Sequence, residues 1–137
     1  MKAVHRLATR LLALIMLTTA TQAGSPAFLI GTYEGGGQEC SGKLSVSARS
    51  IDWRTPSAHC SGLPYEFYNL GEKNGVTRYL FQLRQSQRQC PYTSVLLVQN
   101  GPVAGEATWE AIGYRSDVDR QEGRLDRALA CPMVRLH

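Results

Sequence analysis

The chain is poor in the groups that most enzymes use for catalysis. It has three histidines in 137 residues, and His59 alone lies far from both termini. It contains no Gly-x-Ser-x-Gly nucleophile elbow and no His-Glu-x-x-His zinc motif. Three glycines end at Gly37, but Gln38 and Glu39 follow them in place of the Gly-Lys-Ser/Thr of a phosphate-binding loop. We therefore predict no catalytic residue, and an enzyme of another type is the least favoured alternative.

The sequence has no apolar run long enough to span a bilayer, and its longest apolar run lies near the N-terminus. Lys2, Arg6 and Arg10 come first, Leu11–Leu17 is apolar, and small residues follow as far as Ala23. This order predicts a secretory signal peptide over residues 1–23. The apolar run is far shorter than the roughly 20 residues that span a bilayer. We expect residues 24–137 to form one domain, located in the periplasm or secreted.

The charge balance excludes some partners. Three of the 15 basic residues lie in the leader, which leaves 12 against 11 acidic ones. Basic and acidic residues alternate, as in Asp117-Val118-Asp119-Arg120, whereas a nucleic-acid site needs a clustered basic face. We expect no nucleic-acid partner and no membrane span after signal cleavage. An unknown envelope protein or a small apolar ligand remains as the partner, and the oligomeric state is left open.

The clearest structural pattern is a β-hairpin between Gly31 and Cys60. Leu44 and Val46 alternate with serines, and Ile51 and Trp53 alternate with Asp52 and Arg54. A two-residue turn at Ala48-Arg49 sets Val46 opposite Ile51 and Leu44 opposite Trp53. One face of this hairpin is therefore apolar, and Trp53 is predicted to lie in the core.

The cysteines predict disulfides and not a metal site. The four are Cys40, Cys60, Cys90 and Cys131, and no two form a Cys-x-x-Cys pair. An even number in an exported chain predicts two disulfide bonds, with three possible pairings. Continuing the hairpin register brings Cys40 and Cys60 to the same end, so we favour Cys40–Cys60 and Cys90–Cys131. We expect no metal and no cofactor.

The rest of the chain predicts a small antiparallel barrel. Short alternating segments are separated by Gly, Pro and Asn turns, of which Asn74-Gly75 is the strongest hairpin signal. A turn is also expected between Thr55-Pro56 and Gly62-Leu63-Pro64, before a strand over 65–70. Ser116 is expected to cap one short late helix that ends near Gly123. Together these features favour an all-β fold, a single meander barrel of seven or eight strands stapled by disulfides.

Aromatic residues are the candidates for binding. Most of them fill the interior of a barrel in the simplest interpretation. The tyrosines at four positions carry hydroxyls that need water or a hydrogen-bond partner, so they could line a cavity or a mouth. We take as candidate binding residues Tyr33, Tyr65, Tyr68 and Tyr114.

The first strand carries Gly31-Thr32-Tyr33, and a β-meander with a late short helix follows. This arrangement resembles the calycin group, which includes the lipocalins. That resemblance implies that Tyr33 stands where the group usually has a Trp, and that Arg135 or Arg127 packs across it. In size, export, barrel form and disulfide use the chain is also similar to small periplasmic lysozyme inhibitors, at the level of class.

These observations predict a small exported, non-catalytic binding protein, an inhibitor or partner of an envelope macromolecule. The alternative is a lipocalin-like calyx that carries a small apolar ligand. The state of the interior separates the two: a hollow lined by aromatics favours the carrier, and a filled interior favours the partner-binding protein.

Overall fold

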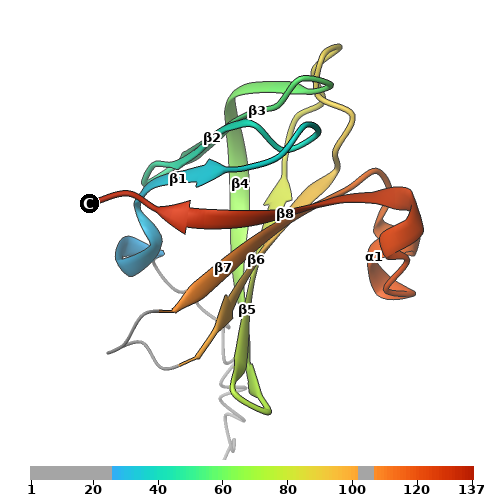
Figure 1. Cartoon of the computed structure of the whole chain (residues 1–137). Helices are drawn as coiled ribbons and strands as arrows, with labels where there is room; N and C mark the ends of the chain where they lie inside the picture. The colour runs from blue at the N-terminus through green and yellow to red at the C-terminus, as the bar shows by residue number, and fades with distance from the viewer. Residues whose placement is uncertain (1–25, 102–106) are drawn as a thin grey trace, which may run out of the picture.

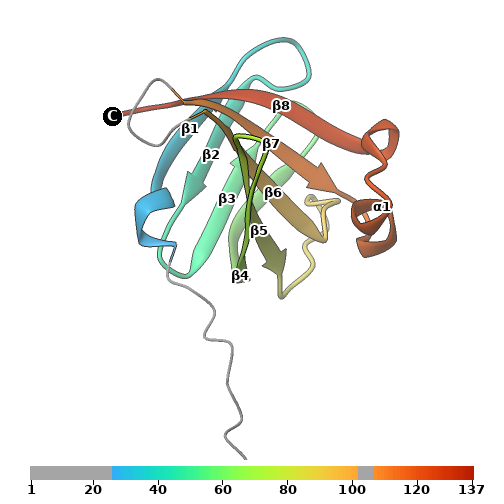
Figure 2. The ribbon, with the colours of Figure 1, turned by 90° about the horizontal axis from the view of Figure 1, so that it is seen from below.

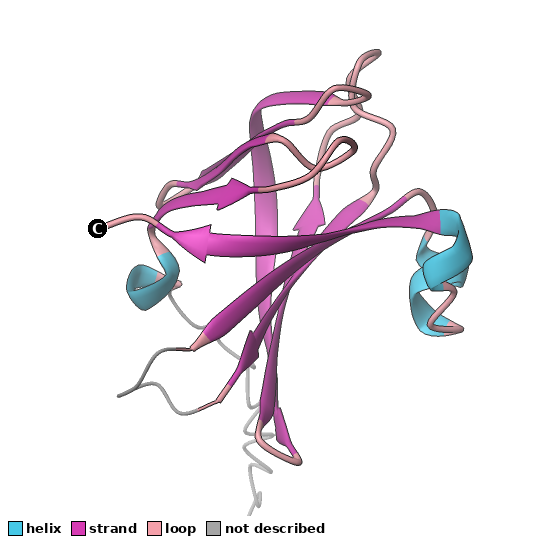
Figure 3. Ribbon diagram, viewed as in Figure 1, coloured by secondary structure: helices cyan, strands magenta, loops and turns pink. Residues whose placement is uncertain are grey.

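A computed structural model describes residues 26–101 and 107–137; the predicted signal peptide, residues 1–23, lies outside this range. Eight antiparallel strands form a closed barrel in which each strand pairs with its neighbour in sequence and the last pairs with the first (Figures 1 and 3). The predicted all-β meander is confirmed. The elements are η1 (Ala27–Leu29), β1 (Gly31–Gly35), β2 (Gly42–Val46), β3 (Ser50–Arg54), β4 (His59–Lys73), β5 (Val76–Leu83), β6 (Ser94–Asn100), β7 (Thr108–Tyr114), α1 (Asp117–Gln121), η2 (Leu125–Arg127) and β8 (Ala128–Arg135).

The barrel has two different ends. The turns that join β2 to β3 and β4 to β5 lie at one end, with η1, and we call this the closed end. The connections β1–β2, β3–β4, β5–β6 and β7–β8 lie at the other, which we call the open end. Short helix α1 lies on the opposite side of the molecule from η1 in both views (Figures 1 and 2).

The predicted hairpin register is correct. Leu44 pairs with Trp53 and Val46 with Ile51, and the Ser47 amide donates to the Ser50 carbonyl around the two-residue turn. Trp53 is fully buried, as the alternation predicted. The Asn74-Gly75 turn is also confirmed, because β4 and β5 pair up to Lys73 and Val76 on either side of it.

Strand β4 is longer than the sequence suggested. The predicted turn between Thr55-Pro56 and Gly62-Leu63-Pro64 is wrong at its far boundary, because β4 begins at His59 and residues 62–64 continue one strand of 15 residues. Gly62 has a φ of 58°, and it allows the strand to bulge without ending. At this bulge the Gly62 amide donates to Asp52 Oδ1 at 2.8 Å. A second register shift between Asn69 and Gly71 bends the same strand again.

Both disulfides form, but the favoured pairing is wrong. The bonds are Cys40–Cys131 and Cys60–Cys90, with no free cysteine. The turn after β3 is tight: the Thr55 amide donates to the Ala58 carbonyl at 2.9 Å, so the chain reverses at once. Cys60 therefore lies beside Trp53 in β4, instead of opposite Cys40 at the end of the first hairpin.

The closed end is sealed by the N-terminal segment and one arginine. Arg135 Nη2 donates to the carbonyl oxygens of Phe28 at 2.7 Å and Ile30 at 3.2 Å. Its guanidinium carbon lies 5.5 Å from the ring centre of Tyr33 and 5.7 Å from that of Trp109. The cation–π contacts and the carbonyl bonds together hold η1 across the barrel.

Side chains fill the barrel interior. Aromatic rings contact each other in successive pairs, among them Tyr65–Phe81 at 4.9 Å and Trp53–Tyr92 at 5.3 Å between ring centres. A hollow calyx would leave its walls in contact with water, yet Phe81 and Trp53 are fully buried. A methyl group on Gly113 would lie 2.7 Å from Tyr92 and 2.9 Å from Trp53. Protein interiors of this density leave no room for a ligand at that level.

Strand β6 is apolar on both faces, as expected for a strand with neighbours on both sides. Its inward residues join the interior. Its outward residues join a second buried cluster on the outer face, whose members are Leu80, Leu96, Val98, Ile112 and Tyr114. The predicted late helix is confirmed as α1: Ser116 Oγ accepts from the Asp119 amide at 3.1 Å, and Gly123 beyond its end has a φ of 65°.

Candidate functional site at the open end

The two disulfides fasten loops of the open end. Cys40 lies in the β1–β2 loop and is bonded to Cys131 in β8, and Cys60 at the start of β4 is bonded to Cys90 in the β5–β6 loop. The bonds close segments of 91 and 30 residues. In the chain-entropy model they contribute about 4.5 and about 3.5 kcal/mol to stability. The open end is therefore built from loops with restricted freedom.

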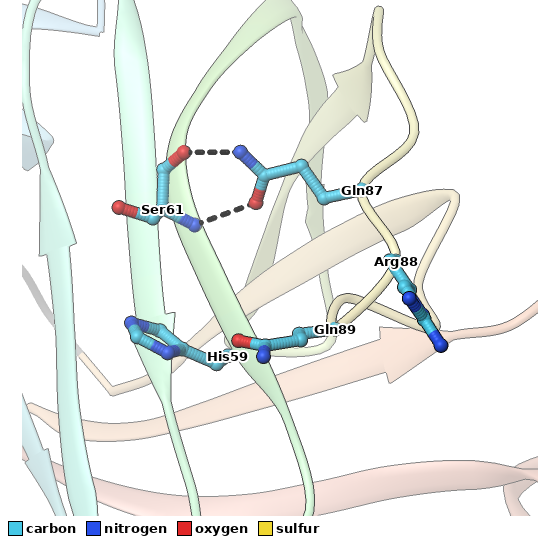
Figure 4. Close-up of a pocket in the computed structure, with 5 residues that line it drawn as sticks. All are labelled: His59, Ser61, Gln87, Arg88 and Gln89. Atoms are coloured by element: carbon cyan, nitrogen blue, oxygen red, sulfur yellow. Dashed lines mark hydrogen bonds between the residues drawn. The ribbon is translucent and has the colours of Figure 1, made fainter.

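Hydrogen bonds hold the β5–β6 loop further. The Gln87 side chain donates to the Ser61 carbonyl at 2.6 Å and accepts from the Ser61 amide at 2.9 Å (Figure 4). The His59 amide donates to the Gln89 carbonyl at 2.9 Å. These hydrogen bonds join the loop to the start of β4, so residues 87–89 have a defined position.

A cavity of about 670 Å³ opens between the β1–β2 loop, the β3–β4 turn and the helical β7–β8 connection. Tyr92 is the aromatic residue that lines this cavity, and its ring packs against the buried ring of Trp53. The charged residues that line it are Glu39, Arg115, Asp119, Asp126 and Arg127. This mixture of charges is poorly suited to an apolar ligand.

Two of these carboxylates already have partners. Arg127 Nη1 lies 3.7 Å from Asp119 Oδ1, and Arg124 Nη2 lies 3.2 Å from Asp126 Oδ2. The hydrogen bond from Arg124 lowers the pKa of Asp126. Asp119 and Asp126 are consequently each balanced by an arginine, and Glu39 is the remaining carboxylate of the cavity.

A second depression lies next to the first, between the β3–β4 turn and the β5–β6 loop. It consists of two cavities of about 310 and 380 Å³ that share the residues His59, Arg88 and Gln89. We call it the rim groove. Its lining is Thr55, Pro56, Ser57, Ala58, His59, Ser61, Gln87, Arg88, Gln89, Pro91 and Arg115. This lining contains no acidic side chain and no Phe, Tyr or Trp.

The surroundings of the rim groove add positive charge. Arg54 Nη2 lies 2.9 Å from His59 Nε2. Beyond His59, a third depression of about 340 Å³ includes Lys43, Arg54 and Asp52. Asp52 is the one acid there, and it accepts the Gly62 amide. One side of the open end is therefore strongly basic.

The four candidate tyrosines do not form one site. Tyr33 and Tyr65 are interior residues, and their hydroxyls donate to the carbonyls of Leu29 at 2.9 Å and Ser47 at 2.6 Å. Tyr114 lies in the outer-face cluster. Tyr68 is exposed on β4, where its hydroxyl donates to Glu66.

Burial raises the pKa of both interior tyrosines, Tyr33 and Tyr65. Desolvation raises the pKa of Tyr33 to about 12, although nearby Arg135 acts in the opposite direction. Burial also raises the pKa of Tyr65. Both hydroxyls are therefore neutral hydrogen-bond donors at ordinary pH, which fits a structural position.

Sequence reasoning missed the basic residues of the open end. Arg54, Arg88 and Arg115 are far apart in the chain, and no pattern in their neighbouring residues links them. The signal that was available is modest: a Pro- and Ser-rich turn before Cys60 and a polar loop before Cys90. Correct pairing of these two cysteines would have brought the turn and the loop together.

The described residues provide no evident metal centre and no membrane helix. Within residues 26–101 and 107–137, no three His, Cys, Asp or Glu side chains gather closely enough to hold a metal ion. No helix in the same range is long and apolar enough to cross a bilayer. Comparison with protein-family models, curated proteins and solved structures finds no match to the chain.

Proposed function

We propose that this chain is an exported, non-catalytic binding protein that acts on a protein of the cell envelope through the open end of its barrel. The filled interior carries this proposal. Trp53, Tyr92 and Gly113 are packed so closely that the level just below the mouth has no space for a ligand. The open end offers concave, charged surfaces held by two disulfides, which are suited to a macromolecular partner.

The small-ligand alternative receives less support from the same geometry. A carrier of an apolar molecule needs an apolar hollow of several hundred Å³. The cavity of about 670 Å³ has the necessary size, but charged side chains line it and it lies above the aromatic layer. The arrangement of the open end therefore favours contacts with a polar surface.

The proposed lack of catalysis is supported by the surroundings of His59. Its Nε2 atom faces the Arg54 guanidinium, whereas a general base is usually oriented by a carboxylate or a carbonyl. Cys60 is next to it in sequence but is held in a disulfide, so it cannot act as a thiolate nucleophile.

The proposal also includes export of the chain and a barrel related in architecture to the calycins. Two disulfides are typical of an oxidising compartment such as the periplasm, and they agree with the signal peptide that the sequence predicts. The contact of Arg135 with Tyr33, together with the closed eight-strand meander, supports a relationship in plan to the lipocalins. Arg127, the other residue considered for this role, lies at the open end.

The test is capture of envelope proteins on immobilised mature protein. The bait variant combines Arg88→Glu with Arg115→Glu at the open end, and Arg49→Glu in the exposed β2–β3 turn is the matched control at the closed end. We expect a specific protein to be retained by the wild type and by Arg49→Glu, and lost on the double variant. Retention of the same protein by all three baits would contradict the proposal.

A further inference from the structure

The rim groove has a net positive charge that the protein does not neutralise. Arg88 and Arg115 are exposed, and neither makes a side-chain hydrogen bond or salt bridge with any residue that the structure describes. Arg124 and Arg127 at the open end differ, since each is paired with a carboxylate, and Arg54 faces the His59 ring. Two free guanidinium groups in a groove without acidic residues are a recognition feature for anions.

The walls of the groove are ordered before any partner arrives. One wall is the β3–β4 turn, where the Ala58 amide donates to Thr55 Oγ1 at 3.0 Å. The other wall is the β5–β6 loop, which the Cys60–Cys90 bond and the two Gln87 hydrogen bonds hold against β4 (Figure 4). A partner that binds there orders few further residues of the protein, so the free-energy cost of fixing the loops on binding is small.

The chemistry of the lining distinguishes between classes of anion. Proteins that bind single-stranded nucleic acids stack successive bases on several aromatic rings, whereas His59 is the one ring in this lining, which has no Phe, Tyr or Trp. An anionic membrane attracts clusters of basic residues on a protein surface, whereas here the arginines border a concave groove. Arginine matches a carboxylate through two parallel hydrogen bonds, and the prolines and amide side chains of the walls suit a peptide chain.

From these observations we propose that the rim groove binds an acidic peptide segment of the protein partner, with carboxylates placed against Arg88 and Arg115. The proposal rests on the proposed function and specifies the chemistry of the partner. His59 and Gln89 form the part of the wall that the two cavities share, where the chain of the segment would pass. His59 contributes shape, and the two arginines contribute the charge recognition.

The experiment uses a fluorescein-labelled hexaglutamate peptide as the probe and measures its anisotropy against the disulfide-bonded mature protein. We expect saturable binding in 50 mM salt that weakens at least tenfold in 500 mM salt, because exposed ion pairs are screened. Arg88→Glu and Arg115→Glu should each weaken binding at least fivefold. Arg49→Glu should change it less than twofold, and labelled hexaglutamine should not bind.

Three results would overturn the proposal. The first is an absence of hexaglutamate binding at 2 mM protein, and the second is equal binding by the wild type and both groove variants. The third is a sulfated hexasaccharide that binds ten times more tightly than hexaglutamate and is lost with the same variants, since the groove would then recognise a polysaccharide. A captured envelope protein that still depends on Arg88 and Arg115 would leave the proposed function standing in any of these cases.

Discussion

The packing around Gly113 offers a stringent test of the filled interior. Gly113 lies in β7 with an ordinary extended backbone, so the change Gly113→Ala adds no backbone strain. The new methyl group would lie 2.7 Å from two ring carbons of Tyr92 and 2.9 Å from Trp53 Cζ3. Carbon atoms prefer separations of about 3.5 to 4.0 Å, so at least one ring must move.

Two effects of Gly113→Ala oppose each other. Overpacking a dense core costs roughly 1 to 3 kcal/mol. Replacing glycine by alanine inside a strand recovers about 0.5 to 1 kcal/mol of conformational entropy. The difference between these ranges is about 0 to 2.5 kcal/mol in the free energy of unfolding. We expect a loss in its upper part, about 1 to 2 kcal/mol, because the rings of Tyr92 and Trp53 are both buried and cannot turn into solvent.

Urea unfolding followed by tryptophan fluorescence measures this loss. Gly36→Ala is the matched control, since a methyl group there would meet nothing within 4 Å, and we expect it within about 0.5 kcal/mol of the wild type. In a Tyr92→Leu background the cost of Gly113→Ala should fall by at least half. If Gly113→Ala left stability unchanged or increased it, the layer at Trp53 would have free space and the argument against a hollow barrel would fail.

Three further predictions concern the ends of the barrel and its interior. Arg135→Met should lower the free energy of unfolding by about 2 to 3 kcal/mol, measured by urea denaturation, because two charge-assisted bonds and two cation–π contacts are lost. The pKa of Tyr33 is raised to about 12 from 10, so its contribution to stability should be complete below pH 10 and lost as pH rises towards 12; thermal unfolding scans across this window check it. Cys60→Ala with Cys90→Ala should cost about 3.5 kcal/mol in the same denaturation assay, and a smaller loss than about 1 kcal/mol would contradict the loop-closure argument.

Local patterns predicted those parts of the fold that local interactions determine. Strict alternation and a two-residue turn determine the pairing of Leu44 with Trp53, and the Asn74-Gly75 turn and the Ser116 cap are likewise decided within a few residues. The glycine at position 62 misled the prediction. Glycine and proline typically mark turns, but here Gly62 forms a bulge inside a strand whose neighbours on both sides hold it in place.

The disulfide pairing and the rim groove could not be predicted, because both depend on tertiary structure. The Cys40–Cys131 bond joins the β1–β2 loop to β8, and these meet where β1 pairs with β8 to close the barrel. The Cys60–Cys90 bond and the rim groove depend on how the β5–β6 loop folds back on the start of β4. Cys60 and Cys131 both belong to the buried interior cluster, so burial does not tell which of them is the partner of a given cysteine. Arg88 and Arg115 could not be recognised as a pair from the sequence. They come together because the β5–β6 loop leads into β6, whose first residue Ser94 pairs with Tyr114 at the end of β7.

The predicted tyrosine set shows a related limit. A hydroxyl that needs a hydrogen-bond partner can obtain it from water, a ligand or a buried carbonyl, and sequence does not distinguish these. Tyr33 and Tyr65 obtain it from main-chain carbonyls inside the barrel. Tyr68 obtains it from a neighbouring side chain on the outer surface. The available partner is a property of the tertiary structure in each case.

Site-specific photo-crosslinking in the cells that make the protein tests the central claim most directly. A benzophenone side chain is introduced at Ser57 or Gln89, both exposed at the rim groove, and at Ala48 in the exposed turn of the closed end as a control. Binding through the open end predicts a discrete protein adduct from positions 57 and 89 and none from position 48. An adduct of equal yield from all three positions, or one from position 48 alone, would contradict it.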